Sequence, residues 1–114
     1  MSDIQQLTKK IMDFFEEYDW VKFHRPKELA VDIFTESGEL LELFKWQTNN
    51  TPKRIAQNKE KIADEIADVT VSALELAHVL KLDMQEIIVK KMKKNRQKYP
   101  IEKARGNDVK YTEL

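Results

Sequence analysis

Residues 26–46 read PKELAVDIFTESGELLELFKW, and this stretch decides the fold. On a helix that turns about 100° per residue, three leucines lie within about 40° of Glu36, and Ile33 lies within about 60°. These leucines are Leu29, Leu40 and Leu43. The stretch is therefore predicted to be an amphipathic helix that carries a glutamate in the centre of its apolar stripe.

A second long helix is expected from Thr51, a suitable N-cap, to about Leu80. Proline at position 52 suits the first helical turn. On this helix Glu65 also lies inside the apolar stripe, with four residues within about 40° of it. They are Val69, Ser72, Leu76 and Val79.

Each of the two helices carries a second acid close to the first. Glu39 follows Glu36 and Asp68 follows Glu65 at a spacing of three residues, which places each pair on one helix face. An isolated ExxE pair is usually a solvated face, but a carboxylate inside an apolar stripe is costly unless a cation compensates it. Oxygen ligands suit Mg²⁺ or Mn²⁺. The two pairs together therefore predict a metal site.

The rest of the chain completes an all-α fold. Apolar spacing predicts a helix over about 3–18, and a capping-box-like start at Asp83 predicts another that ends before Pro100. Only two glycines and three prolines occur, which favours long helices over many strands. We expect one domain over 1–114, a four-helix bundle at about 3–99 with an extended tail at 100–114. So short a chain with half-exposed helices favours an oligomer.

The composition excludes several classes of protein. The formal net charge is zero, which argues against a nucleic-acid or anionic-membrane partner. The absence of cysteine excludes disulfides and thiolate metal ligands. No signal peptide or membrane-crossing run is recognised, so a cytoplasmic protein is expected.

Other polar residues allow two interpretations each. Lys91, Asn95 and Tyr99 share one face of the last predicted helix. Either this face binds phosphate, a base edge or sugar, and an aromatic group, or the helix simply extends beyond the core at its end. Three further residues either stack on a nucleobase or pack in a core or interface: Trp20, His24 and Trp46.

One more motif raises a competing metal site. Glu75-x-x-His78 has the spacing found in di-iron bundles, but it occurs once where two such motifs are needed. Both residues are therefore predicted to lie at the surface or at an interface.

The ordered motifs resemble those of the MazG-like all-α nucleoside triphosphate pyrophosphohydrolases, most closely the small dCTP pyrophosphatase branch. The resemblance covers about residues 19–114. Its marks are Asp19-Trp20-x-x-Phe23-His24-x-Pro26, Glu36-Ser-Gly-Glu39-Leu-x-Glu42-Leu-Phe-x-Trp46, Asp64-Glu65-x-x-Asp68-Val69, Lys91-x-x-x-Asn95-x-x-x-Tyr99-Pro100 and Lys110-Tyr111-Thr112-Glu113-Leu114.

The resemblance implies hydrolysis of a (deoxy)nucleoside triphosphate, with dCTP or modified dCTP as candidates, to the monophosphate and pyrophosphate, a housekeeping role in the nucleotide pool. It implies that Mg²⁺ is bound by Glu36, Glu39, Glu65 and Asp68. It further implies that the phosphates and sugar are bound by Lys91, Asn95 and Tyr99. The residues that it implies for the base pocket are Trp20, His24 and Trp46. Finally, it implies that the chain forms a homodimer or homotetramer.

We interpret Glu36, Glu39 and Lys91 as catalytic, with Glu39 as the proton acceptor. Ser72 stands where similar enzymes can carry an aromatic residue, so the preferred base is left open. The alternative to an enzyme is a non-enzymatic helical oligomer that acts as an interaction module.

Overall fold

The computed structural model describes all residues from Met1 to Leu114 and contains helices but no strands. The helices are α1 (Asp3–Glu17), α2 (Pro26–Glu42), α3 (Pro52–Val79), α4 (Met84–Lys98) and α5 (Ile101–Ala104). Short 3₁₀ turns occur at Val21–Phe23, Gln47–Asn50 and Tyr111–Glu113. The all-α prediction is confirmed.

The predicted helix starts are confirmed by their caps. The Thr51 hydroxyl accepts a hydrogen bond from the Arg54 N–H at 3.3 Å, and Pro52 opens α3. The Asp83 carboxylate accepts a hydrogen bond from the Glu86 N–H at 3.0 Å at the start of α4. Each cap satisfies one backbone donor that would otherwise have no partner in the first turn.

Helix α2 ends at Glu42, four residues before the predicted end at Trp46. The Leu43 and Phe44 N–H groups donate to carbonyls three residues back, those of Leu40 and Leu41. This tightening to a 3₁₀ turn closes the helix although the apolar pattern continues. Periodicity alone therefore placed the end too late.

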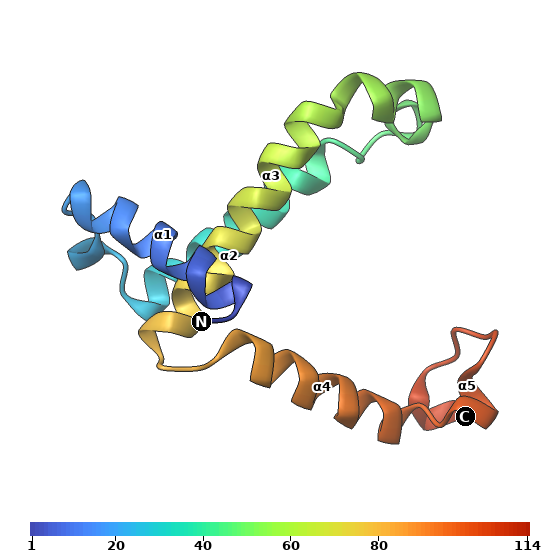
Figure 1. The fold of residues 1–114 in the computed structure, drawn as a ribbon. Coiled ribbons are helices and arrows are strands. Elements are labelled where there is room, and N and C mark those ends of the chain that lie inside the picture. Colours follow the sequence, from blue (N-terminus) through green and yellow to red (C-terminus); the bar gives the residue numbers. More distant parts are fainter. The chain divides into compact units, whose positions relative to one another are not determined.

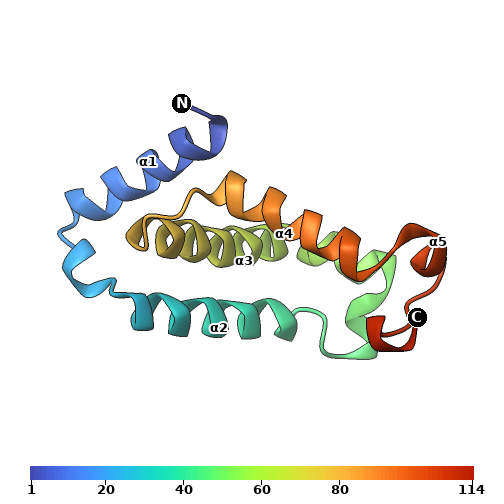
Figure 2. The same ribbon diagram turned by 90° about the horizontal axis from the view of Figure 1, so that it is seen from below.

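The chain forms two compact units, Met1–Lys81 and Leu82–Leu114. In the first unit, α2 and α3 lie side by side and run antiparallel, as both views show (Figures 1 and 2). Helix α1 packs against α3 towards its C-terminal end. The buried apolar core of this unit is small and consists of Met12, Leu29, Leu74 and Ala77.

In the second unit, the predicted extended tail is wrong. The Pro100 carbonyl accepts hydrogen bonds from the Lys103 and Ala104 N–H groups, which form α5. The Tyr111 ring then lies edge-on to Tyr99, with ring centroids 6.0 Å apart, so the tail folds back onto the end of α4. Such short turns are too brief to show a periodic pattern.

Large apolar side chains remain exposed on the first unit. Phe34 on α2 is 82 % exposed, Leu41 on the same helix is 64 % exposed, and Ile66 on α3 is 51 % exposed. Neither α3, the longest helix, nor any other helix has the apolar length that a membrane crossing requires.

Candidate active site

The antiparallel packing of α2 and α3 brings three of the four predicted acids together. One carboxylate oxygen from each of Glu36, Glu65 and Asp68 lies within 4.8 Å of the other two, a spacing that suits a common metal ion. Glu36 comes from α2, and the other two come from α3. The two sequence pairs thus become one acidic cluster, which is made of Glu36, Glu65 and Asp68.

The fourth acid lies at the edge of the acidic cluster. Glu39 is exposed on the next turn of α2 and interacts with both Glu36 and Glu65. Its carboxylate is therefore close to the cluster and also accessible to water.

Two oxygens of the acidic cluster have no hydrogen-bond donor. Glu36 Oε2 and Glu65 Oε2 are buried and have no partner within the chain. A buried acceptor without a donor costs about 1–3 kcal/mol, and more when it is charged. A cation would supply the missing partner for both oxygens, and an all-carboxylate donor set suits a hard divalent ion. The residues present therefore fit a divalent metal.

The same burial raises two carboxyl pKa values. Burial is the largest cause that raises the pKa of Glu36 from its ordinary 4.5 to about 7, and the neighbouring Glu39 raises it further. Burial also raises the pKa of Glu65. Both carboxyl groups thus hold a proton more tightly in the folded chain when no metal competes for their oxygens.

We expect the metal-free protein to lose stability as pH rises. A carboxyl whose pKa is higher in the folded chain stabilises the fold fully below its unfolded pKa, and this stabilisation is lost as pH rises through the folded pKa. For Glu36 the interval runs from 4.5 to about 7. Thermal melting in EDTA across this interval should show a falling melting temperature, and Glu36→Gln should flatten the curve. Parallel curves for both proteins would contradict the prediction.

His24 makes a polar contact that the sequence did not suggest. Its Nδ1 lies 2.7 Å from Glu75 Oε2, and the side chain of Glu75 is 2 % exposed. Glu75 is buried within the chain, so its predicted position at the surface or at an interface is wrong, whereas His78 is exposed as expected. The reason is that α3 is covered on two sides near its end. Buried Leu74 lies about 180° from Glu65 on the helical wheel, so Glu75 falls between two packed faces.

We expect His24→Ala to destabilise the protein by about 3 kcal/mol, because it leaves a buried carboxylate without its partner. The double variant His24→Ala/Glu75→Leu should regain part of this loss, since no unpaired charge remains. Urea unfolding of the two variants measures the difference. Equal destabilisation by both would contradict the expectation.

The three predicted base-pocket residues lie at two places. Trp20 and His24 both contact Phe15, with ring centroids at 6.3 Å and 4.7 Å. Trp46 follows the opposite end of α2, a helix of 17 residues and therefore about 25 Å long. Trp46 is 64 % exposed and lies beside the Lys45 ammonium. One chain therefore does not bring Trp46 to the other two residues.

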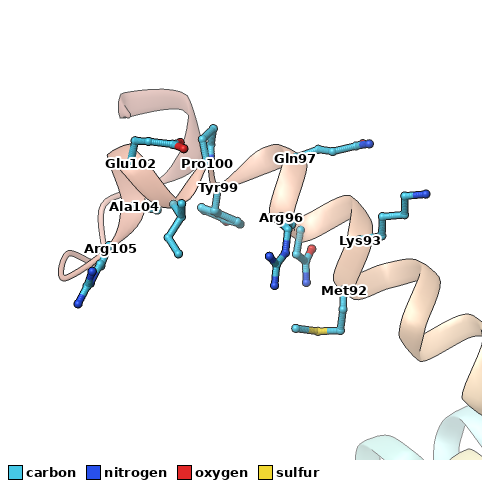
Figure 3. Close-up of a pocket in the computed structure, with 11 residues that line it drawn as sticks. Met92, Lys93, Arg96, Gln97, Tyr99, Pro100, Glu102, Ala104 and Arg105 are labelled. Carbon is cyan, nitrogen blue, oxygen red and sulfur yellow. The ribbon is translucent and has the colours of Figure 1, made fainter.

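The second unit contains a pocket of about 950 Å³ along the end of α4 and around α5 (Figure 3). Two of the predicted nucleotide-binding residues, Asn95 and Tyr99, line this pocket together with the cations Lys93, Arg96 and Arg105. The third, Lys91, is exposed on α4 and does not line it. The sequence had indicated Lys91 as the main cation, and it had not suggested Arg105.

Residues 32–114 match the MazG-like family. The chain belongs to this family. Its sequence is 38 % identical to dCTP pyrophosphatase 1 of Rattus norvegicus over 117 residues, which cover 100 % of this chain and 67 % of the relative. It is 34 % identical to dCTP pyrophosphatase 1 of Homo sapiens over the same shares of each chain. The fold is similar to the crystal structure of a pyrophosphatase from Archaeoglobus fulgidus, with a TM-score of 0.79, 34 % identity and coverage of 88 % of this chain and 94 % of that one.

This MazG-like protein is therefore a nucleotide pyrophosphohydrolase, as its relatives and its structural neighbour show. The predicted resemblance is confirmed, and the alternative of a non-enzymatic interaction module is wrong. The acidic cluster contains no histidine, and Glu75 pairs with His24, which argues against a di-iron bundle.

Proposed function

We propose that the chain hydrolyses (deoxy)nucleoside triphosphates, dCTP or a modified dCTP among them, to the monophosphate and pyrophosphate. The proposed cofactor is Mg²⁺, with Mn²⁺ as a substitute. The observation that carries the proposal is the acidic cluster, whose Glu36 and Glu65 have buried oxygens without a donor. The family match supplies the class of reaction.

Glu36, Glu65 and Asp68 would hold the metal, and Glu39 would complete the set from the exposed edge of the cluster. The chemistry that such an ion would supply is neutralisation of phosphate charge and orientation of the water for in-line attack on the phosphoanhydride. The packing of α2 on α3 already brings the three carboxylates of the acidic cluster within 4.8 Å of one another, which supports binding with little reorganisation of these three.

Glu39 is proposed as the general base. Its carboxylate is exposed, so water can approach it, and it lies one turn from Glu36. A carboxylate oxygen of Glu39 would accept the proton that the attacking water loses when it bonds to phosphorus. The Lys91 ammonium would stabilise the negative charge that develops on the phosphate oxygens.

The remaining site residues would hold the rest of the nucleotide. Asn95 can donate to and accept from sugar or base atoms, and the phenol of Tyr99 can donate to a phosphate oxygen. Trp20, His24 and Trp46 are proposed to surround the base, Trp20 and Trp46 by stacking. Ser72 is partly exposed on α3 and leaves the identity of the preferred base to experiment.

The test is pyrophosphate release from a panel of canonical and modified dNTPs in the presence of Mg²⁺. We expect turnover for the wild type and a fall of about a hundredfold or more for Glu39→Gln and Asp68→Asn, because each removes a charged oxygen from the site. Unchanged turnover in both variants would reject the proposed site.

We also propose that the chain works in the cytoplasm as a homodimer or homotetramer, with residues 1–114 as one functional domain and without a nucleic-acid or membrane partner. Trp46 lies at the opposite end of α2 from Trp20 and His24, which supports the proposal that a second copy supplies its Trp46 to the base pocket. The exposed Phe34, Leu41 and Ile66 offer apolar area for such an interface.

We expect Phe34→Asp to reduce the measured mass in solution to that of a monomer. Pyrophosphate release should fall in the same variant, because the base pocket is proposed to need two copies. Light scattering coupled to gel filtration measures the mass, and the exposed change Lys59→Asp on α3 is the control. A wild-type protein of 13.5 kDa in solution would reject the oligomer.

A further inference from the structure

The His24–Glu75 pair joins two distant parts of the chain inside the first unit. The residues are 51 positions apart, and the distance from Nδ1 of His24 to Oε2 of Glu75 is 2.7 Å. The histidine side chain is 19 % exposed, whereas the glutamate side chain is almost fully buried. The mechanism proposed above gives Glu75 no role, although a buried carboxylate is costly to keep.

Two contacts restrict the orientation of the imidazole ring of His24. The hydrogen bond with Glu75 occupies Nδ1. The ring of Phe15 meets the imidazole edge-on, with centroids 4.7 Å apart and an angle of 80° between the planes. These contacts come from α3 and α1, so the ring is held from two helices at once.

The pairing also determines the hydrogen-bonding roles of the two ring nitrogens. With Glu75 as a carboxylate, which can only accept, the tautomer that fits the 2.7 Å contact has its proton on Nδ1 of His24 and donates it to Glu75. No hydrogen bond to Nε2 of His24 is found within the chain, and the side chain keeps 19 % of its surface exposed. In neutral imidazole with a proton on Nδ1, Nε2 is an acceptor.

We propose that Glu75 is a positioning residue for nucleobase recognition. It holds Nδ1 of His24, and Nε2 is the atom through which His24 binds the base, as an acceptor from an exocyclic amino group or a ring N–H. This inference rests on one part of the proposed function, the assignment of His24 to the base-binding site. Discrimination between bases then depends on a residue that does not touch the nucleotide.

Nuclear magnetic resonance of the histidine nitrogens tests the first half of the proposal on the full chain. The protein has two histidines, and the exposed His78 is an internal control. At about pH 8, where an ordinary histidine is neutral, we expect the proton on Nδ1 of His24 and the usual mixture of tautomers for His78. Glu75→Gln should keep the Nδ1 proton, because the amide oxygen still accepts, and Glu75→Leu should release it. An Nε2–H tautomer of His24 in the wild type would overturn the proposal.

The same spectra test binding at Nε2. Addition of α,β-imido-dCTP with Mg²⁺ should shift the Nε2 resonance of His24 and leave that of His78 unchanged. A bound nucleotide that shifts neither nitrogen of His24 would overturn the proposal.

Steady-state kinetics test the effect on selectivity. The readout is the ratio of kcat/KM for the best dNTP to that for the other dNTPs. Loss of one well-placed hydrogen bond corresponds to roughly a tenfold change, so we expect Glu75→Leu to lower the ratio roughly tenfold, mainly through KM. Glu75→Gln should restore most of the ratio.

Variants of the histidine separate positioning from a purely structural role. The amide of His24→Asn can replace Nδ1 towards Glu75 but offers nothing at Nε2, so we expect a stable protein with the lowered ratio. Adding Glu75→Leu to this variant should lower the ratio no further, because Glu75 acts through His24. His78→Asn should match the wild type.

The outcomes distinguish this inference from the proposed function. One outcome is that the wild type hydrolyses dNTPs while Glu75→Leu and His24→Asn fold and keep the wild-type ratio of kcat/KM values. That outcome would overturn the inference and leave the proposed function standing. A wild type that releases no pyrophosphate but shows the nucleotide-dependent shift at Nε2 would support the inference and reject the proposed hydrolysis.

Discussion

Glu36→Gln is expected to lower dNTP turnover by at least about a thousandfold, because it removes one charge from the acidic cluster that is proposed to bind the metal. The shape of the side chain is kept, so packing of α2 on α3 should survive. Pyrophosphate release at saturating Mg²⁺ measures the loss. The matched control is Glu60→Gln, an exposed glutamate on α3 outside the cluster, which should retain wild-type turnover.

The same substitution is expected to raise the melting temperature of the metal-free protein by about 5 °C at pH 8. Glu36 is the carboxyl whose pKa burial and Glu39 raise to about 7, so at pH 8 its charge opposes folding. An amide removes that charge and can donate a hydrogen bond to a neighbouring carboxylate. Calorimetry of Glu36→Gln in EDTA should therefore show a higher melting temperature than that of the wild type. Calorimetry in Mg²⁺ should show that the variant has lost the stabilisation that the metal gives the wild type.

A variant that loses activity and also melts earlier in EDTA would contradict this account. It would show that Glu36 stabilises the fold directly and that its charge is compensated within the chain. The opposite signs expected for activity and stability are typical of a residue that is retained for function at a cost to the fold.

Lys91→Met is expected to lower kcat about a hundredfold with a smaller change in KM, because its ammonium is proposed to stabilise charge that develops during phosphoanhydride cleavage. Methionine keeps much of the aliphatic side chain and suits a helix. Single-turnover measurements of pyrophosphate release separate the chemical step from product release.

Two neighbouring lysines on α4 supply the control for this second experiment. Lys90 and Lys94 are exposed like Lys91, and their replacement by methionine removes the same charge. Both variants should remain within about threefold of the wild type, since distant exposed charges are screened. Equal losses in all three variants would indicate a general effect of charge and would contradict a specific role for Lys91.

Much of the fold could be predicted because it depends on local spacing. The apolar residues recur at helical intervals, and the caps at Thr51 and Asp83 together with Pro52 mark where helices begin. The acids Glu36 and Glu65 could be recognised as unusual for the same reason, since the wheel places them among leucines and valines. Such patterns involve residues three or four positions apart, which any helix brings to one face.

The partners across the fold could not be predicted from spacing. The prediction placed Glu75 at the surface or at an interface, and nothing in the local pattern of α3 shows that α1 covers a second face of this helix. Likewise the tail beyond Pro100 has no periodicity, and it is the contact between Tyr111 and Tyr99 that folds it back.

The sequence by itself determined the four long helices, the two acidic pairs and the family to which their order belongs. Only the tertiary structure decided that three acids meet, that two of their buried oxygens have no donor, and that His24 is held by Glu75. The physical reason is that helix formation follows from neighbours within one turn. Burial and charge pairing depend instead on which faces of different helices are packed together.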